Sequence, residues 1–157
     1  MKKFFVLLLM ACCFTFTVAD AAELPQFLNG NKNYPLIWKD SQAAWYLDKS
    51  SIKIKVNDTP FFIITAQILT ANGNETYEYF FDEEEADMRI FDRAVSDWQY
   101  ISPSDGVSKK YLMYIGEAVF YVSQGRKFYG NYLWKKEIDD KIIYTDEFAD
   151  EIYNGWT

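Results

Sequence analysis

The chain has 157 residues, of which 50% are hydrophobic and 19% aromatic, and its formal net charge is −7. An acidic chain lacks the basic surface that nucleic acids and anionic membranes require, so we expect neither as a partner. The chain contains no histidine and only two cysteines, Cys12 and Cys13.

The first residues have the layout of a secretory signal peptide. Lys2 and Lys3 precede an uncharged apolar run over residues 4–18. This run is shorter than the ~20 apolar residues of a comfortable membrane span. A small-x-small cleavage pattern follows at residues 19–21, so we expect cleavage after Ala21. The alternative is a lipid anchor on Cys12, since residues 9–12 loosely match a lipoprotein box.

Removal of residues 1–21 would leave residues 22–157 as a single exported domain with no transmembrane span. Loss of Lys2, Lys3 and Asp20 would change the net charge from −7 to −8. Without cysteine there is no disulfide, and without cysteine or histidine the usual nucleophile–base pairs and zinc-type metal sites are absent. We find no glycine-rich phosphate loop, and therefore expect no cofactor and no metal.

Residues 22–35 contain two prolines and three asparagines and are typical of an irregular lead-in. Strand signals follow over residues 44–48, 51–56, 60–70, 76–81 and 88–93. In the second strand Ile52, Ile54 and Val56 are expected on one face, and in the third Phe62, Ile64, Ala66 and Ile68. Tyr77, Tyr79 and Phe81 are expected to share a face of the fourth strand.

Asn72-Gly73-Asn74 predicts a hairpin turn, and consecutive strands with short connections indicate an antiparallel meander. Over residues 109–123 the spacing of the apolar residues changes to that of a helix. Its apolar stripe is Leu112, Ile115, Val119 and Val122, and Gly116 would let the helix lie close to the sheet.

We expect Lys110, Tyr114, Glu117 and Tyr121 on the opposite side of this helix, away from the sheet. Residues 127–134 are interpreted as another strand and residues 145–152 as a short closing helix. The fold class is therefore α+β: an antiparallel β-meander sheet with one main amphipathic helix packed on one face.

The run Asp82-Glu83-Glu84-Glu85 raises the question of a metal site. A calcium loop needs oxygens at alternate positions and a glycine for the sharp turn, whereas these four carboxylates are contiguous and no glycine follows. We interpret the run as a solvated connection between two strands, with weak cation binding or docking on a basic partner as the alternatives.

Carboxylate chemistry is the catalysis that this composition still permits. A glycosidase would need two carboxylates a set distance apart. Asp48 and Asp97 lie beside apolar residues that could raise a pKa, although both positions are typical of a turn or a strand end. No motif marks any catalytic residue.

The aromatic residues give the best reason to expect a binding role. Exposed aromatic rings stack on sugar rings or anchor protein interfaces, and core packing is the alternative for each of them. The candidate binding surface consists of Trp45, Trp98, Tyr100, Tyr129 and Trp134.

Two segments resemble small exported bacterial proteins. Residues 45–52, WYLDKSSI, resemble an opening found in surface-adhesin E-like proteins, in which an aromatic strand ends in Asp and a Ser pair precedes an Ile-led strand. Residues 116–130, GEAVFYVSQGRKFYG, resemble a helix of uncharacterised secreted proteins. The resemblance implies a small exported α+β domain that contacts proteins at the cell surface, and no binding residue follows from it.

From these patterns we expect a small, exported, non-enzymatic domain that acts as a binding or interaction module in the bacterial cell envelope. It would be periplasmic, secreted or at the cell surface, and its partner would be an envelope or surface protein or a glycan. The alternative is a carboxylate-dependent glycan hydrolase or other envelope enzyme. The sequence leaves the oligomeric state and the identity of the ligand open.

Overall fold

The structure is a computed structural model, which describes residues 24–39, 43–101, 107–130, 135–138, 141–144 and 153–157. Six antiparallel strands form one sheet in chain order, as the meander interpretation predicted. The strands are β1 (Leu36–Lys39), β2 (Ala44–Asp58), β3 (Phe61–Thr70), β4 (Gly73–Asp82), β5 (Asp87–Asp92) and β6 (Asp97–Tyr100). The predicted α+β fold class is confirmed.

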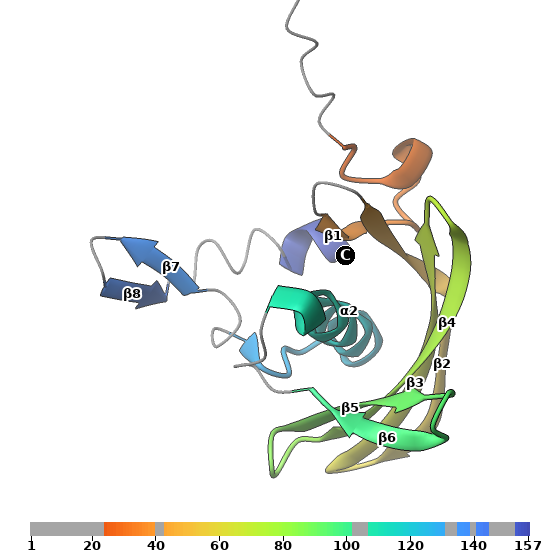
Figure 1. The fold of residues 1–157 in the computed structure, drawn as a ribbon, viewed down its shortest axis with the longest axis vertical. Helices are drawn as coiled ribbons and strands as arrows, with labels where there is room; N and C mark the ends of the chain where they lie inside the picture. The colour runs from red at the N-terminus through yellow and green to blue at the C-terminus, as the bar shows by residue number, and fades with distance from the viewer. Residues whose placement is uncertain (1–23, 40–42, 102–106, 131–134, 139–140, 145–152) are drawn as a thin grey trace, which may run out of the picture.

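One long helix, α2 (Val107–Gln124), lies in the hollow of the strongly curved sheet (Figure 1). We call the face of the sheet toward α2 the inner face. A short 3-10 helix, η1 (Leu28–Gly30), precedes the sheet. After α2 come a separate two-stranded sheet, β7 (Lys135–Ile138) with β8 (Lys141–Tyr144), and a helical turn at residues 153–156. No helix among the described residues has the length and apolar character needed to cross a membrane.

Alternation along β3 and β4 produces the core, as predicted. The four inner-face residues of β3, from Phe62 to Ile68, are each at most 1% exposed, and Tyr79 and Phe81 of β4 are fully buried. A residue pair that lies directly opposite across two strands shares a face, so the inner face is continuous from β3 through Tyr79 to Ile90 of β5. This face packs against α2.

The prediction for β2 was wrong at Val56. Ile54 lies opposite Ile64, but Val56 lies opposite Ile63, the neighbour of Ile64, because a register shift separates the two pairs. Successive residues of β3 point to opposite faces, so Ile54 and Val56 do too. A bulge of this kind inserts one residue and inverts the alternation, which sequence periodicity alone does not show.

Several elements differ from the predicted ones. The segments 44–48 and 51–56 are one strand, and β1, β6 and the β7–β8 hairpin were not predicted. Residues 127–130 are not a strand, since Gly130 has a positive φ of 57° and the preceding backbone turns to bind Glu117. The rest of that predicted strand, 131–134, and the predicted helix at 145–152 lie outside the described residues.

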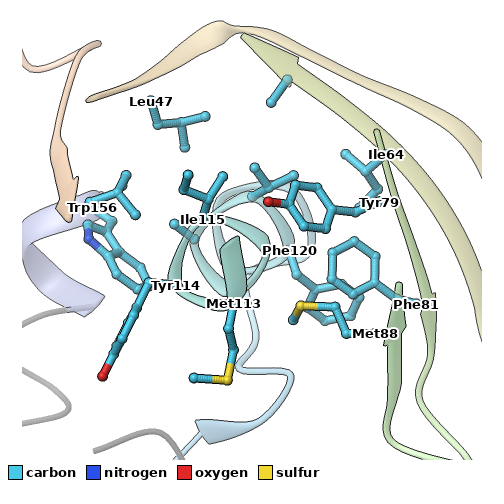
Figure 2. Packing of buried hydrophobic residues seen from close by; sticks show 14 of the residues in the cluster. Leu47, Ile64, Tyr79, Phe81, Met88, Met113, Tyr114, Ile115, Phe120 and Trp156 are labelled. Atoms are coloured by element: carbon cyan, nitrogen blue, oxygen red, sulfur yellow. The ribbon is translucent and has the colours of Figure 1, made fainter. Parts of the chain in front are cut away.

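The side of α2 that was predicted to lie away from the sheet is not exposed in its middle part. Tyr114 and Glu117, expected away from the sheet, are 8% and 0% exposed. Figure 2 shows sheet residues such as Leu47 and Phe81 on one side of α2 and Trp156, from the final helical turn, on another. The helix is therefore buried by the sheet and by the C-terminal residues together, which makes it the centre of the fold.

Gly116 allows the close approach of α2 to the sheet, as predicted. A Cβ atom at this position would lie 2.5 Å from Sδ of Met88 and 2.9 Å from Cε1 of Tyr79. The Tyr79 hydroxyl donates a 2.9 Å hydrogen bond to the carbonyl of Leu112, one turn earlier on the helix. The position of α2 on the inner face is thus fixed by both a steric and a polar contact.

Candidate functional site

The acidic run forms the tight connection between β4 and β5, which confirms the interpretation as a turn. Oδ1 of Asp82 accepts hydrogen bonds from the backbone N–H groups of Glu84 and Glu85, at 3.0 and 3.3 Å. Glu83 forms a bidentate ion pair with Arg126, just after α2, at 2.6 and 2.7 Å. Within the described part of the chain, no three His, Cys, Asp or Glu side chains group together in a way that could hold a metal ion.

The two aspartates considered for catalysis organise the local backbone. Oδ1 of Asp48 accepts hydrogen bonds from the backbone N–H and the hydroxyl of Ser50, at 3.0 and 2.6 Å. Oδ1 of Asp97 accepts the N–H of Trp98 at 2.8 Å. Asp97 is the first residue of β6, which is the strand-end position that the sequence favoured. Asp48 lies within β2, next to a register shift, because the two predicted strands around it are one strand.

The aromatic candidates fall in different environments. The ring of Trp45 stacks on that of Tyr111, with centroids 5.2 Å apart, and Tyr100 at the end of β6 is 52% exposed. Tyr129 is buried, and its hydroxyl donates a 2.9 Å hydrogen bond to the carbonyl of Ile101. Trp134 lies outside the described residues.

Trp98 belongs to the outer face of the sheet. It lies opposite Phe91, the neighbour of the inner-face residue Ile90, and its ring contacts Phe91 and Phe80 at centroid distances of 5.3 and 6.0 Å. The four candidates that the structure describes therefore do not form one surface. Tyr100 lines the cavity described next, and Trp45 contacts it through Tyr111.

A cavity of about 430 Å³ opens between the last strands of the sheet and the helix. Strands β4, β5 and β6 and helix α2 all contribute walls, which include the side chains or backbone of Tyr77, Ile90, Gln99, Tyr100, Tyr111 and Leu112. The cavity lies beyond Tyr79, where the inner face is no longer filled by α2. Its size is within the ~300–1,000 Å³ of typical small-ligand sites.

Charged and polar groups line the same cavity. Two acidic residues and one basic residue, Glu75, Asp92 and Arg93, are among those that line it. The Tyr77 hydroxyl donates a 2.7 Å hydrogen bond to Oε2 of Glu75. Burial, assisted by this hydrogen bond and the nearby negative charge, raises the pKa of Tyr77 well above its usual value, and burial also raises the pKa of Tyr111. Both phenols are therefore protonated at neutral pH.

Sequence reasoning did not select Tyr77 or Tyr111 for a site. Tyr77 was assigned to the inner face of a strand, and inner-face residues are usually core. It lines a cavity because the pairing of β4 with β5 stops at Tyr79, two residues away. Strand β4 is longer than β5, so part of β4 has no partner in β5. Such a difference in length is the signal that could have indicated a cavity beside Tyr77.

Glu117 is a second polar centre that the sequence did not reveal. Its carboxylate is fully buried and accepts the backbone N–H groups of Phe128 and Tyr129, at 2.9 and 2.8 Å, and more weakly that of Gly130 at 3.4 Å. The Tyr153 hydroxyl donates to the same carboxylate. Burial raises the pKa of Glu117 above its usual value, although the four hydrogen bonds favour the ionised form.

Glu117 stabilises one wall of the cavity indirectly, through two hydrogen bonds in series. It holds the backbone of Tyr129, whose hydroxyl binds the carbonyl of Ile101, and Ile101 lines the cavity. The buried carboxylate is thus a structural group, since its oxygens are used by backbone and tyrosine donors and it is closed to solvent.

Taken together, the fold and the cavity define a small α+β domain in which an antiparallel meander curves around one helix and leaves an aromatic-lined cavity at one end. Comparisons of the chain with protein-family models, with curated proteins and with solved structures found no match. The resemblance to surface-adhesin E-like proteins therefore stays a prediction.

Proposed function

We propose that this protein is a small, exported, non-enzymatic binding module of the bacterial cell envelope and that the cavity beside Tyr77 and Tyr111 is its binding site. The cavity carries the proposal, because it combines aromatic and aliphatic walls with a few charged groups, as binding sites do. The signal-like N-terminus supports an envelope location. The absence of histidine supports a role other than nucleophilic catalysis.

The test is recovery of a partner from envelope extract of the organism that produces the protein. The exported chain would be immobilised, and bound proteins and glycans would both be identified. We expect near-stoichiometric recovery of a specific partner. A variant that fills the cavity, Gln99→Trp, should lose the partner, because Gln99 is an exposed residue of the cavity wall.

Val95→Trp is the matched control. Val95 is 61% exposed in the β5–β6 connection and does not line the cavity, so this variant adds the same ring elsewhere. Equal recovery by the wild type and both variants would place binding outside the cavity. Recovery of nothing by the wild type would contradict the binding role.

A carboxylate-dependent glycan hydrolase is the second candidate, favoured by the presence of both Glu75 and Asp92 in an aromatic-lined cavity. Purified cell-wall glycan would be incubated with the wild type and with the variants Glu75→Gln and Asp92→Asn. Steady release of reducing ends by the wild type, lost in both variants, would replace the binding module with an enzyme. No release would leave the binding module as the better account.

A further inference from the structure

Strand β4 has an open edge beside the cavity. It pairs with β3 along its whole length, from Gly73 to Asp82, but β5 pairs with it only from Tyr79 onward. Within the part of the chain that the structure describes, the six residues Gly73–Glu78 are therefore not paired with any strand on their second side. Every second residue of such a stretch directs its N–H and C=O away from β3, toward that open side.

An open edge of this kind is a template for another strand. The end of β5 shows the path that an added strand would follow. Ile90 lies opposite Tyr79, and Asp92, two residues further on, is the last residue of β5. A segment that continued in the same direction would pass Tyr77 and then Glu75.

The cavity lies along this path. Glu75, Thr76 and Tyr77 of β4 form one wall, the end of β5 forms another, and Tyr111 and Leu112 of α2 form a third. An added strand would thus find backbone partners on β4 and a pocket for alternate side chains on the inner face. The hydrogen bonds would supply affinity, and the pocket would supply selectivity.

The charges around the cavity indicate the composition of the segment. Two acidic residues and one arginine line the cavity, and the whole chain carries a net charge of −7. Glu78 is paired with Lys55 at 2.8 Å, whereas Glu75 and Asp92 accept hydrogen bonds from neutral donors, the Tyr77 hydroxyl and the N–H of Ala94. These neutral donors leave the negative charge of both side chains for a basic partner. Apolar side chains at alternate positions, with basic residues between them or beside them, would fit both the walls and the charge.

We infer that the partner contributes an extended peptide segment, apolar at alternate positions and basic overall, which adds as a strand to residues Gly73–Glu78 of β4 and inserts side chains into the cavity. This inference rests on the proposed function, because it specifies what the binding module binds. A strand in this place would complete the inner face of the sheet, which α2 and β5 leave open there.

The experiment is a selection of random dodecapeptides displayed on phage against the full exported chain. We expect enriched sequences with alternating apolar residues and a net positive charge. No enrichment over an uncoated surface, or enriched peptides that are acidic or lack alternation, would overturn the inference.

Hydrogen exchange then tests the mode of binding. With an enriched peptide at saturation, alternate amides within Gly73–Glu78 should exchange about tenfold or more slowly, because each gains a hydrogen bond. Two sets of N-methylated peptides would be compared, each methylated at every second backbone nitrogen. Methylation of the nitrogens that face β4 should weaken binding about tenfold, and methylation of the other set should have little effect. Unchanged exchange in this stretch would overturn strand addition even if the peptide binds.

Charge reversal gives an independent check. Glu75→Lys should weaken the binding of an enriched peptide about fivefold, because an attractive exposed charge pair becomes a repulsive one. Glu84→Lys makes the same change in net charge in the β4–β5 turn, away from the cavity, and should have little effect. Equal effects of the two variants would mean nonspecific attraction and contradict the site.

Failure of the inference and failure of the proposed function would give different results in these experiments. If envelope extract yields a glycan that Gln99→Trp no longer binds, while no peptide is enriched, the binding module stands and strand addition is wrong. If neither extract nor library yields a ligand, both are wrong.

Discussion

The hydroxyl of Tyr153 donates a 2.5 Å hydrogen bond to Oε1 of Glu117, and both side chains are buried. This contact joins the middle of α2 to the last helical turn of the chain. The same carboxylate also binds the backbone of residues 128–130, and Lys127 lies over the Tyr153 ring at 4.8 Å. A single buried carboxylate thus fastens the described C-terminal residues to the centre of the domain.

Glu117→Gln should destabilise the domain by about 2–3 kcal/mol, because one acceptor oxygen is replaced by an amide N–H₂ that faces backbone donors. The free energy of unfolding in urea measures this. The exposed residue Glu84 supplies the control, Glu84→Gln, which should change stability by less than about 0.5 kcal/mol. Equal stabilities of the two variants would show that the hydrogen bonds of Glu117 contribute little.

The pH dependence of stability follows from the raised pKa of Glu117. Above the ordinary value of 4.5 the unfolded chain loses this proton while the native state keeps it, so the free energy of unfolding falls as pH rises toward the native pKa. The slope contributed by one group is at most about 1.4 kcal/mol per pH unit.

Glu117→Gln lacks this contribution, and its stability deficit relative to the wild type should therefore shrink as pH rises from about 4.5. Urea unfolding of both proteins across this range measures the deficit. A deficit that widens with pH would mean that the four hydrogen bonds outweigh burial and lower the pKa of Glu117.

Gly116→Ala should destabilise the domain by about 1–2 kcal/mol despite the better helix propensity of alanine, because the new Cβ would overlap Met88 and Tyr79. Thermal and urea unfolding measure the effect. Lys110→Ala on the same helix only shortens a side chain, adds no atom at the helix–sheet contact, and should change stability by less than about 0.5 kcal/mol. A stabilising Gly116→Ala would show that α2 can move away from the sheet at little cost.

Arg126 links the β4–β5 turn to the end of α2. It pairs with Glu83 and lies over the rings of Phe62 and Phe120, at 5.6 and 5.9 Å from their centroids. A double-mutant cycle with Arg126→Gln and Glu83→Gln should give a coupling of about 0.5–1 kcal/mol that falls with added salt, since both side chains are partly exposed.

Arg126→Ala should cost more than Arg126→Gln, because it also removes the side-chain stem that contacts the two rings. Arg93→Ala, at an exposed arginine of the cavity rim, is the matched control for loss of one positive charge and should change the unfolding free energy less. Identical losses for the glutamine and alanine variants would assign the whole effect to the charge of Arg126.

Since we propose that the protein is exported, we predict that its processed form begins at Ala22, because residues 19–21 form the cleavage pattern after the apolar run. Intact mass measurement of protein purified from the envelope fraction determines the first residue. A mass that begins at Cys12 and includes fatty acyl chains would show a lipid anchor instead.

Much of the architecture could be predicted from local patterns. The alternation of Phe62, Ile64, Ala66 and Ile68 specified a strand and its buried face, and the stripe from Leu112 to Val122 specified the helix, because burial of apolar side chains follows the period of each element. Gly116 could be assigned to the helix–sheet contact for the same reason. The turn at residues 82–85 followed from contiguous charges that cannot all be buried or share one ion.

Tertiary structure alone decided the rest. Glu117 was predicted to lie on the side away from the sheet, and its burial could not be predicted, because a helical period shows which residues share a face and not how many elements surround the helix. Residues 153–156, which follow it by more than thirty positions in the sequence, cover that side. The bulge in β2 and the early end of β5 are likewise properties of strand pairing, which no single strand encodes.

The properties of the cavity also divide into those that the sequence determines and those that the tertiary structure decides. The sequence determined that the chain is acidic, rich in aromatic residues and without histidine, and hence which chemistries are available to it. The tertiary structure decided that Tyr77 and Tyr111 line an open space, while Tyr129 is buried and Trp98 lies on the outer face. An aromatic side chain is stable in either environment, so the lengths and pairing of neighbouring strands determine which rings are available for binding.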